Sequence, residues 1–487
     1  MVRLHRLTFV VAIVRRFRRG SAPLGGWSFA FWFSCAFALV FQYLATWTKP
    51  GDDDRWWSLV VGRNILAEHA VRTTLGPQSL HPGLVWPDHE WLYCLATALF
   101  ADGRMYWIFA AAHGVALAVA VFFVLGECVR ERVSPFWTTF LVGAVGKALA
   151  DWEQLRAEAF VPALLVAVVL GSRSRSRIGP PIVVGAVIIW ANWHGSYPLA
   201  LLYLASRSTS RLRIATFFTA IVATLCNPMG FGSWTSVASF PYATIGRYIA
   251  EWFPSYSMVI AIGQIFSFLL PGLLCAVWGS PRRWKFSAYR LAFPTFTLVM
   301  ALRSVRFMKT LGVFGAPALA GLFRERRPIR SGLAWAAAIP FVLGTAVPVM
   351  GSLLGRDGGR DPAFGLATAV GSYDAERWAF RLGPTACFDD DSFGSVFEGM
   401  GGRANMDGRI DAFPERAIAE QNRFSGDDAM ARSFARETCA VAVISGSSAD
   451  PAMRRAGWHL ARTRTTYGLH GRYEIWTRGR NWRGIPS

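Results

Sequence analysis

The sequence predicts an α-helical polytopic membrane protein with about 11 transmembrane helices and a small C-terminal α/β soluble domain. Of the 487 residues, 53% are hydrophobic and only 17% are charged, whereas soluble domains carry about 25% charged residues. Apolar stretches long enough to cross a ~30 Å hydrocarbon core as helices recur from Trp27 to about Gly351. The chain then turns polar, which predicts a transmembrane domain, 27–352, and a C-terminal domain, 353–487.

The basic N-terminal segment, 1–26, ends just before the first apolar stretch, Trp27–Trp47, which carries no charge. Because positive residues that flank a span stay in the cytoplasm, this order predicts a cytoplasmic N-terminus. The stretch is longer than the apolar core of a typical signal peptide, and further spans follow it. We therefore expect an uncleaved signal anchor.

The net charge of +20 raises the question of nucleic-acid binding. The basic residues cluster between apolar stretches, at 130–132, 173–177, 207–213, 282–285 and 324–330. The expected spans are 27–47, 104–126, 135–150, 158–171, 181–195, 197–206, 213–226, 257–278, 287–303, 306–323 and 331–351. With these spans every basic cluster is cytoplasmic, so the positive-inside rule accounts for most of the charge and no nucleic-acid partner is expected. The same count places the C-terminal domain outside the cytoplasm.

The segment between the first two spans, 48–103, is far longer than the usual connection of about 4–6 residues, and loops of such length are usually functional or disordered. Four tryptophans and two helix-like pieces argue against disorder in this one. The second piece, Glu90–Phe100, has helical periodicity but is too short to cross a bilayer. We therefore predict a long extracytoplasmic loop that contains a helix lying in the membrane interface.

Two acidic clusters lie in this loop. Asp52, Asp53 and Asp54 follow the first span, and Asp88, His89 and Glu90 stand between tryptophans further along. Such carboxylates can act as general bases or bind a divalent cation through hard oxygen ligands. The structural alternatives are a solvated end of the span for the first cluster and a helix N-cap at Asp88 for the second.

The polar run from Trp190 to Pro198 interrupts an apolar stretch and contains Asn192 and His194. Polar groups and broken helices are tolerated at membrane depth mainly where they line a cavity. We therefore expect Asn192 and His194 to line one, with a helix–helix hydrogen bond as the alternative.

Several charged residues fall at the outer ends of the predicted spans, and the arginines among them run against the positive-inside bias. They are Arg156, Glu158, Glu251, Arg303 and Arg306. Guanidinium groups on this side suit a phosphate or pyrophosphate, whereas arginines that snorkel to lipid headgroups are the alternative.

The C-terminal domain alternates short apolar runs with helix-like polar stretches, which predicts a small α/β fold. Cys387 and Cys439 are candidates for a disulfide if the domain lies outside the cytoplasm, although the sequence alone leaves the pairing open. Asp407 and Arg409 could belong to a ligand patch, but Asp407-Gly408-Arg409-Ile410-Asp411 is also good turn chemistry with a local ion pair.

No metal-binding cysteine and histidine spacing, P-loop, dinucleotide fingerprint or nucleophile elbow occurs in the sequence, which disfavours those classes. A transporter is disfavoured as well, because neither repeat symmetry nor paired intramembrane charges are visible.

Seven short motifs occur in order along nearly the whole chain. They are Asp54-Arg55-Trp56-Trp57-Ser58-Leu59, Gly62-Arg63-Asn64-Ile65, His89-Glu90-Trp91-Leu92, Trp190-Ala191-Asn192-Trp193-His194-Gly195, Asn227-Pro228-Met229-Gly230, Glu251-Trp252 and Asp407-Gly408-Arg409-Ile410-Asp411. Together they resemble a group of bacterial membrane proteins related to the GT-C glycosyltransferases. The sequence departs from that pattern at Ser58, where histidine is usual, and at Ala157-Glu158, where Pro-Gln is usual.

The resemblance implies a multi-pass protein of the bacterial inner membrane that transfers sugar from a polyprenyl-phosphate donor to a glycan, lipid or protein acceptor. It places the active site on the outer face, beneath the first long loop. In such enzymes an acidic residue just after the first span commonly acts as the base or binds the reaction centre, and Asp54 is at the matching position. On this hypothesis Asp54 and Glu90 are the catalytic carboxylates. The donor-binding candidates are Arg63, His89, Asn192, His194, Arg156, Arg303 and Arg306. Asp53, Glu251, Asp407 and Arg409 are further candidates.

No cofactor is implied, and a divalent cation at Asp52, Asp53 and Asp54 stays open. The alternative function is a non-catalytic scaffold or lipid-carrier-binding component of an envelope polysaccharide system.

Overall fold

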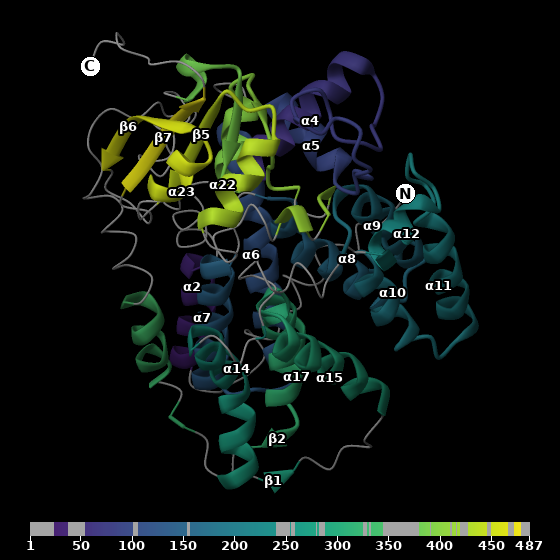
Figure 1. The fold of residues 1–487 in the computed structure, drawn as a ribbon. Coiled ribbons are helices and arrows are strands. Elements are labelled where there is room, and N and C mark those ends of the chain that lie inside the picture. Colours follow the sequence, from purple (N-terminus) through teal and green to yellow (C-terminus); the bar gives the residue numbers. More distant parts are fainter. Residues whose placement is uncertain are drawn as a thin grey trace.

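The computed structural model describes the residues 24–37, 54–100, 106–152, 156–239, 254, 259–278, 280–281, 288–324, 329–330, 333–343, 379–389, 391–409, 412–414, 416–418, 427–445, 450–465 and 472–478. They form a helical body with a mixed β-sheet at one end (Figure 1).

The helices are α2 (Leu24–Ala36), α4 (Asp54–Glu68), α5 (Trp91–Phe100), α6 (Tyr106–Arg130), α7 (Pro135–Trp152), η3 (Ala157–Phe160), α8 (Val161–Arg173), α9 (Gly179–Trp193), α10 (Pro198–Ala205), α11 (Arg211–Ala223), α12 (Gly232–Ser239), α14 (Val259–Trp278), α15 (Ala288–Arg303), η6 (Val305–Phe307), α16 (Met308–Thr310), the π-helical turn η7 (Leu311–Gly315) and α17 (Ala316–Ala320) in the body. A further apolar helix covers Ala334–Leu343. In the C-terminal part they are α20 (Asp391–Gly399), α22 (Asp427–Arg436) and α23 (Asp450–Arg455).

Helices lie within or overlap every predicted span. By length and composition, one helix among the described residues, Ala111–Arg130 within α6, is long and apolar enough to cross a membrane alone. Five other apolar helices in the described part, such as Gly179–Trp193, have 10–17 residues. The count of about 11 crossings therefore stays a prediction.

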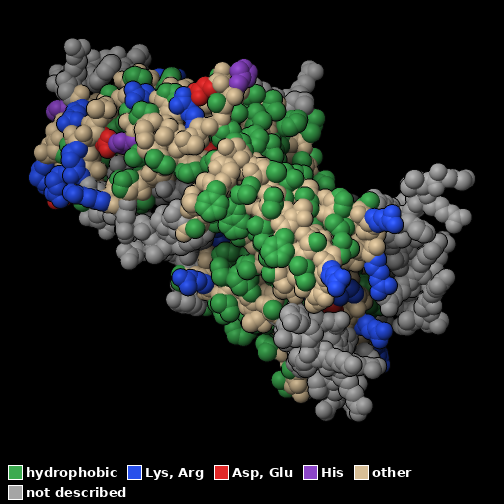
Figure 2. Space-filling model, turned by 90° about the vertical axis from the view of Figure 1, so that its right-hand side faces the viewer, with side chains coloured by type: hydrophobic (Ala, Val, Ile, Leu, Met, Phe, Trp, Pro, Cys, Tyr) green, Lys and Arg blue, Asp and Glu red, His purple; other side chains and the backbone are tan. Residues whose placement is uncertain are grey.

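Large apolar side chains are exposed on the outer faces of the body. Val115, Phe218 and Phe266 expose 59%, 58% and 62% of their surface, and Figure 2 shows hydrophobic side chains spread over much of the face that it presents. In water such a surface would be an aggregation liability. In a bilayer it faces acyl chains of the same polarity, as expected for a membrane protein.

The C-terminal sheet has the strand order β4-β3-β5-β7-β6. Its strands are β3 (Thr385–Phe388), β4 (Arg403–Ala404), β5 (Val441–Ser445), β6 (Trp458–Thr465) and β7 (Arg472–Arg478), and a separate two-stranded ladder joins β1 (Ser280–Pro281) to β2 (Phe323–Arg324). β3 is parallel to β4 and β5, whereas β5–β7 and β7–β6 are antiparallel.

Alternate residues of β5 enter two different cores. Val441 and Val443 lie in one, and Ala442 and Ile444 lie in the other, so both faces of the sheet are covered. Cys387 and Cys439 form a disulfide, with a Cα–Cα distance of 5.7 Å. The predicted domain boundary at 352/353 lies outside the described residues.

The first long loop packs on this C-terminal part. The backbone N–H of Leu80 donates to the carbonyl of Ala404 (2.8 Å), and the N–H of Ala404 donates to the carbonyl of Gln78 (3.2 Å). Trp56 of α4 is buried with Val396 of α20. The loop is thus ordered between α4 and α5, and the C-terminal part holds it.

Helix α5 packs so closely on α4 that a Cβ on Gly62 would lie 2.0 Å from the carbonyl oxygen of Cys94. The buried residues of α5 include Tyr93, Cys94 and Thr97. The face with the more polar residues is therefore the one that meets protein. The interfacial placement of this helix stays a prediction.

Candidate active site

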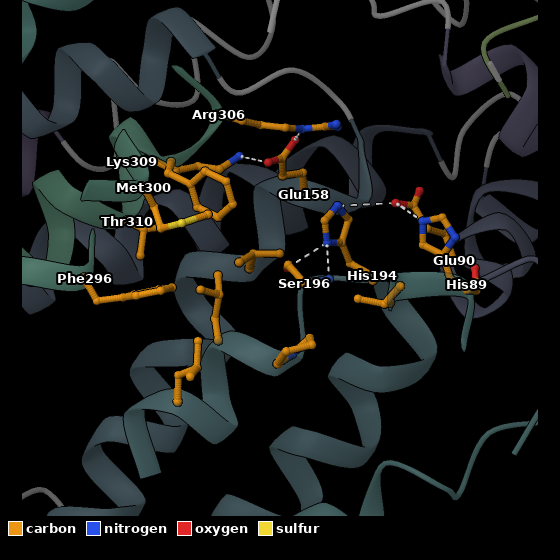
Figure 3. Close-up of a pocket in the computed structure, with 18 residues that line it drawn as sticks. His89, Glu90, Glu158, His194, Ser196, Phe296, Met300, Arg306, Lys309 and Thr310 are labelled. Atoms are coloured by element: carbon orange, nitrogen blue, oxygen red, sulfur yellow. Dashed lines mark hydrogen bonds and ion pairs between the residues drawn. The ribbon is translucent and has the colours of Figure 1, made fainter. Parts of the chain in front are cut away.

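A cavity of about 250 Å³ lies where α9 ends and α10 begins (Figure 3). Charged and imidazole side chains line one part of it: His89, Glu90, Glu158, His194, Arg306 and Lys309. Apolar side chains line much of the rest: Val161, Pro198, Leu199, Leu202, Val237, Phe296, Met300 and Phe307. Leu202 in this apolar wall is 45% exposed.

The break between α9 and α10 follows from its sequence. His194 has an extended backbone, φ −163° and ψ 137°, which ends α9. Pro198 stands at the first position of α10, where its missing N–H has no partner to lose and its fixed φ suits a helix. The link between the two helices presents His194 and Ser196 to the cavity.

Three charged side chains of this lining form an ion-pair cluster. Oε2 of Glu158 lies 2.8 Å from Nε of Arg306, and Oε1 lies 2.7 Å from Nζ of Lys309. Arg306 and Lys309 are three residues apart in the turn that follows α15, a spacing that brings both to one face. The three formal charges sum to one positive charge, so the cluster suits an anion.

The carboxylate of Glu90 is flanked by two imidazoles. Its Oε1 lies 3.3 Å from Nε2 of His194 and 3.6 Å from Nε2 of His89. The backbone N–H of Glu90 donates to Oδ1 of Asp88 (3.0 Å), so Asp88 has the local capping role that the sequence suggested as an alternative. Glu90 thus reaches the cavity from the loop before α5, and His194 reaches it from the helix break.

Asn192 lies outside the lining of this cavity, contrary to the expectation. Its amide nitrogen donates to the carbonyls of Ile188 and Cys226, both at 2.8 Å, and its Oδ1 accepts from Nε1 of Trp91 at 2.8 Å. Asn192 therefore makes the hydrogen bonds between helices that the alternative interpretation expects. Asn192 ties α5 to α9 and so holds the segment that carries His89 and Glu90.

The other predicted donor-binding arginines do not line the cavity either. Arg63 is exposed on α4, and Arg303 is exposed at the end of α15. Arg156 lies next to Glu158 without reaching the lining, although its charge acts on that carboxylate. Of the four arginines assigned to the donor, Arg306 alone is part of the lining.

Several predicted residues cannot be placed. Asp52, Asp53, Glu251 and Asp411 lie outside the described residues, and of Asp54 only the backbone, at the start of α4, is described. Within the described part of the chain no group of three or more His, Cys, Asp or Glu side chains could hold a metal ion. The divalent cation suggested for the Asp52–Asp54 run is therefore untested.

Asp407 and Arg409 lie in the C-terminal part, buried and paired with each other, as the turn interpretation predicts. Arg409 donates through Nε to both carboxylate oxygens of Asp407 (2.9 and 3.0 Å) and through its terminal nitrogen to Glu398 (2.8 Å). Burial and the carboxylate of Asp407 raise the pKa of Glu398 well above its usual value, and Arg409 opposes the rise. This arrangement agrees with the turn and local ion pair, and the ligand role of the two residues stays a prediction.

The sequence did not predict Lys309 or Ser196 as part of the site, and it indicated no role in the site for Glu158. Lys309 carried a usable signal, because an ionisable residue inside an apolar stretch is functional by default. Ser196 carried none beyond its place in the interrupted helix.

No protein-family model and no curated protein sequence matches the chain. Among solved structures, the chain is similar to the archaeal oligosaccharyltransferase AglB from Archaeoglobus fulgidus in complex with an inhibitory peptide and a dolichol-phosphate, with a TM-score of 0.55 and 11% identity over 86% of this chain and 70% of that one. It is also similar to the apo form of the Archaeoglobus fulgidus oligosaccharyltransferase, with a TM-score of 0.53 and 11% identity over 87% and 69%.

ArnT from Cupriavidus metallidurans, bound to undecaprenyl phosphate, aligns over 92% of this chain and 98% of that one, with a TM-score of 0.49 and 14% identity. At these identities the similarity concerns the fold alone. The conclusion on the fold rests on the two oligosaccharyltransferase structures. The chain therefore shares its fold with these oligosaccharyltransferase structures, in agreement with the fold that the GT-C resemblance of its motifs implies.

Proposed function

We propose that this protein is a membrane glycosyltransferase that moves a sugar from a polyprenyl-phosphate donor to an extracytoplasmic acceptor. The observation that carries the proposal is the division of the cavity into a charged part and an apolar part. A polyprenyl phosphate has the same division, with an anionic head on a hydrocarbon chain. The dolichol-phosphate in the similar AglB structure supports the assignment.

In this proposal the phosphate lies beside Arg306 and Lys309, and the isoprenoid chain follows the wall formed by Leu199, Leu202 and Phe296. The cations stabilise the negative charge that grows on the phosphate as the bond from the anomeric carbon to the phosphate oxygen breaks. Glu158 holds the two cations in place by its bidentate contact.

Glu90 takes the proton from the acceptor hydroxyl while the hydroxyl oxygen attacks the anomeric carbon, which inverts its configuration. The products are the glycosylated acceptor and the lipid phosphate. Asp54, at the start of the neighbouring helix α4, is the second candidate base. The disulfide in the C-terminal part supports a position of that part outside the cytoplasm, and with it an outward-facing site in a bacterial inner membrane.

Lipid binding tests the cation assignment. Purified protein in nanodiscs is titrated with undecaprenyl phosphate, and binding is followed by native mass spectrometry. Arg306→Met and Lys309→Met should each weaken binding by about 10-fold or more, because a charge-assisted hydrogen bond is lost. Arg303→Met is the matched control, since Arg303 lies three residues away but is exposed outside the cavity, and it should bind like the wild type. Equal affinity in all four proteins would contradict the proposal.

Glycan output tests catalysis against the alternative of a non-catalytic carrier-binding component. Glu90→Gln and Asp54→Asn are expressed in cells that lack the chromosomal copy, and envelope glycans and lipid-linked sugars are analysed. Loss of the base should lower transfer by about 100-fold or more while the protein accumulates normally. Normal glycan output from both variants would contradict the catalytic role of these carboxylates, and loss in Arg306→Met beside it would favour the carrier-binding alternative.

A further inference from the structure

The hydrogen bonds of His194 define which of its ring nitrogens carries the proton. The backbone N–H of Ser196 donates to Nδ1 at 3.1 Å. A backbone N–H can only donate, so Nδ1 must offer its lone pair and carries no hydrogen in this arrangement. Because a neutral imidazole has one N–H, that hydrogen is on Nε2.

The hydroxyl of Ser196 supports the same tautomer. Its Oγ accepts from Nε1 of Trp190 at 3.1 Å, and an indole N–H is also only a donor. Oγ lies 2.7 Å from Nδ1 of His194. With Trp190 directed at its oxygen, the hydroxyl can point its own proton at Nδ1. Two donors from Ser196 therefore face the same lone pair (Figure 3).

A protonated His194 is incompatible with these contacts. An imidazolium would place a third N–H at Nδ1, opposite the backbone N–H of Ser196. The charged side chains Glu90, Glu158, Arg306 and Lys309 line the same cavity as the ring, as does His89. The hydrogen-bond geometry, and not this balance of charges, decides the tautomer.

We infer that His194 is a positioning residue, held as the neutral Nε2–H tautomer, whose N–H orients the carboxylate of Glu90. Nε2 lies 3.3 Å from Oε1 of Glu90, a polar contact that can shorten when substrate binds. With Nδ1 occupied by Ser196 and Nε2 facing a carboxylate as a donor, His194 has no lone pair to offer an acceptor hydroxyl. The base in this cavity is then Glu90, an assignment that rests on the proposed function, whereas the tautomer does not.

The tautomer is tested without substrate by nitrogen NMR of protein with ¹⁵N-labelled histidine in nanodiscs at neutral pH. The chain has 8 histidines, and the signal that disappears in His194→Gln identifies His194. The expected spectrum shows an unprotonated Nδ1 and a protonated Nε2. A protonated Nδ1, in either the other tautomer or the imidazolium, would overturn the inference even if transfer activity is confirmed.

Two isosteric variants test the positioning role. The amide nitrogen of His194→Gln replaces the Nε2–H donor, whereas the amide oxygen of His194→Asn replaces only the Nδ1 acceptor. We expect His194→Gln to keep kcat within about 10-fold of the wild type, because the donor to Glu90 survives, and His194→Asn to lose as much as Glu90→Gln. A general base at position 194 would be lost equally in both. Equal loss in the two variants, or the better activity in His194→Asn, would reject the donor role.

Discussion

Gly195 allows His89 to enter the site. A Cβ added at Gly195 would lie 2.9 Å from Cδ2 of the His89 ring, closer than real side chains approach. The imidazole of His89 therefore occupies the space that any other residue at 195 would fill. The glycine is required here by close packing between the helix break and the first long loop, and not by an unusual backbone angle.

Gly195→Ala should displace the His89 ring and disturb Glu90 while leaving the fold intact. Misplacement of a catalytic group by about 1 Å can lower the rate by about 100-fold, so we expect a loss of this order in transfer. Gly185→Ala is the matched control, because nothing lies within 4 Å of a Cβ there and alanine favours the helix interior of α9. Activity in membranes and the thermal unfolding midpoint are measured for both. Equal activity in the two variants would mean that His89 has no role.

The candidate site could be predicted in part at the level of single residues. His89, Glu90, His194 and Arg306 stood out because titratable groups in or beside apolar stretches are expensive unless they are used. Asn192 stood out for the same reason and proved structural. The sequence cannot distinguish these cases, because the partners of the Asn192 amide lie on α5, on α9 itself and at Cys226 after α11, up to 101 residues away.

At the level of elements, the C-terminal part reaches the loop that carries Glu90. The guanidinium of Arg409 lies over the ring of Trp86, 5.5 Å from its centroid. Asp88, two residues further on, caps the backbone of Glu90, and its charge attracts Arg409. The ion cluster of Arg409 with Asp407 and Glu398 thus stabilises the conformation of the catalytic loop as well as its own domain.

The titration of Glu398 should make the stability of this ion cluster, and with it the stability of the C-terminal part, depend on pH. Its pKa is raised in the folded protein, so folding takes up a proton. The stabilisation from that proton is complete below the unfolded value near 4.5 and is lost as the pH rises through the folded value. We expect the unfolding midpoint, followed by tryptophan fluorescence, to fall as the pH is raised above 4.5, and Glu398→Gln to flatten this fall because the amide keeps both a donor and an acceptor without titrating.

Glu68→Gln is the control for this experiment. Glu68 pairs with Arg72 on the exposed face of α4, and its pKa is lowered by that partner. Its removal should leave the fall of stability above pH 4.5 unchanged, since both states are already ionised there. A wild-type midpoint that rises over this range, or one that falls equally in Glu398→Gln, would show that Glu398 is not the titrating group.

The elements of the body were predictable from apolar runs and their breaks, because lipid forces each buried backbone into a helix. Their exact ends were less so. Helix α9 begins and ends two residues before its predicted span, and α10 is shorter than its own, since His194 ends the first helix and Pro198 begins the second. The ion-pair cluster depended on the turn after α15, whose cap by Ser304 sets the direction of Arg306.

For the whole molecule, the disulfide bears on the stability of the C-terminal part and on the side of the membrane where that part lies. Cys387 and Cys439 are 52 residues apart, so their link removes loop entropy from the unfolded chain, by about 4 kcal/mol in the chain-entropy description. Disulfides persist in compartments outside the cytoplasm. The bond should therefore form in cells if the C-terminal part is extracytoplasmic.

Maleimide labelling of denatured membranes tests this expectation. Of the 7 cysteines, the two of the disulfide should react only after reduction, and the other five should react without it. Cys387→Ser should abolish the difference and lower the unfolding midpoint. Reaction of all 7 cysteines in membranes that were never reduced would contradict an extracytoplasmic C-terminal part.

The sequence by itself determined the membrane class, the helical body and the order of the motifs, because hydropathy and the distribution of charge act locally and need no knowledge of packing. Only the tertiary structure decided which motif residues meet. Glu90, Glu158, His194 and Lys309 come from four separate segments, and their distances depend on how the start of α5, η3, the end of α9 and α16 pack. Side-chain partners are a property of the packed chain, and a linear pattern identifies polar residues without saying which of them face one another.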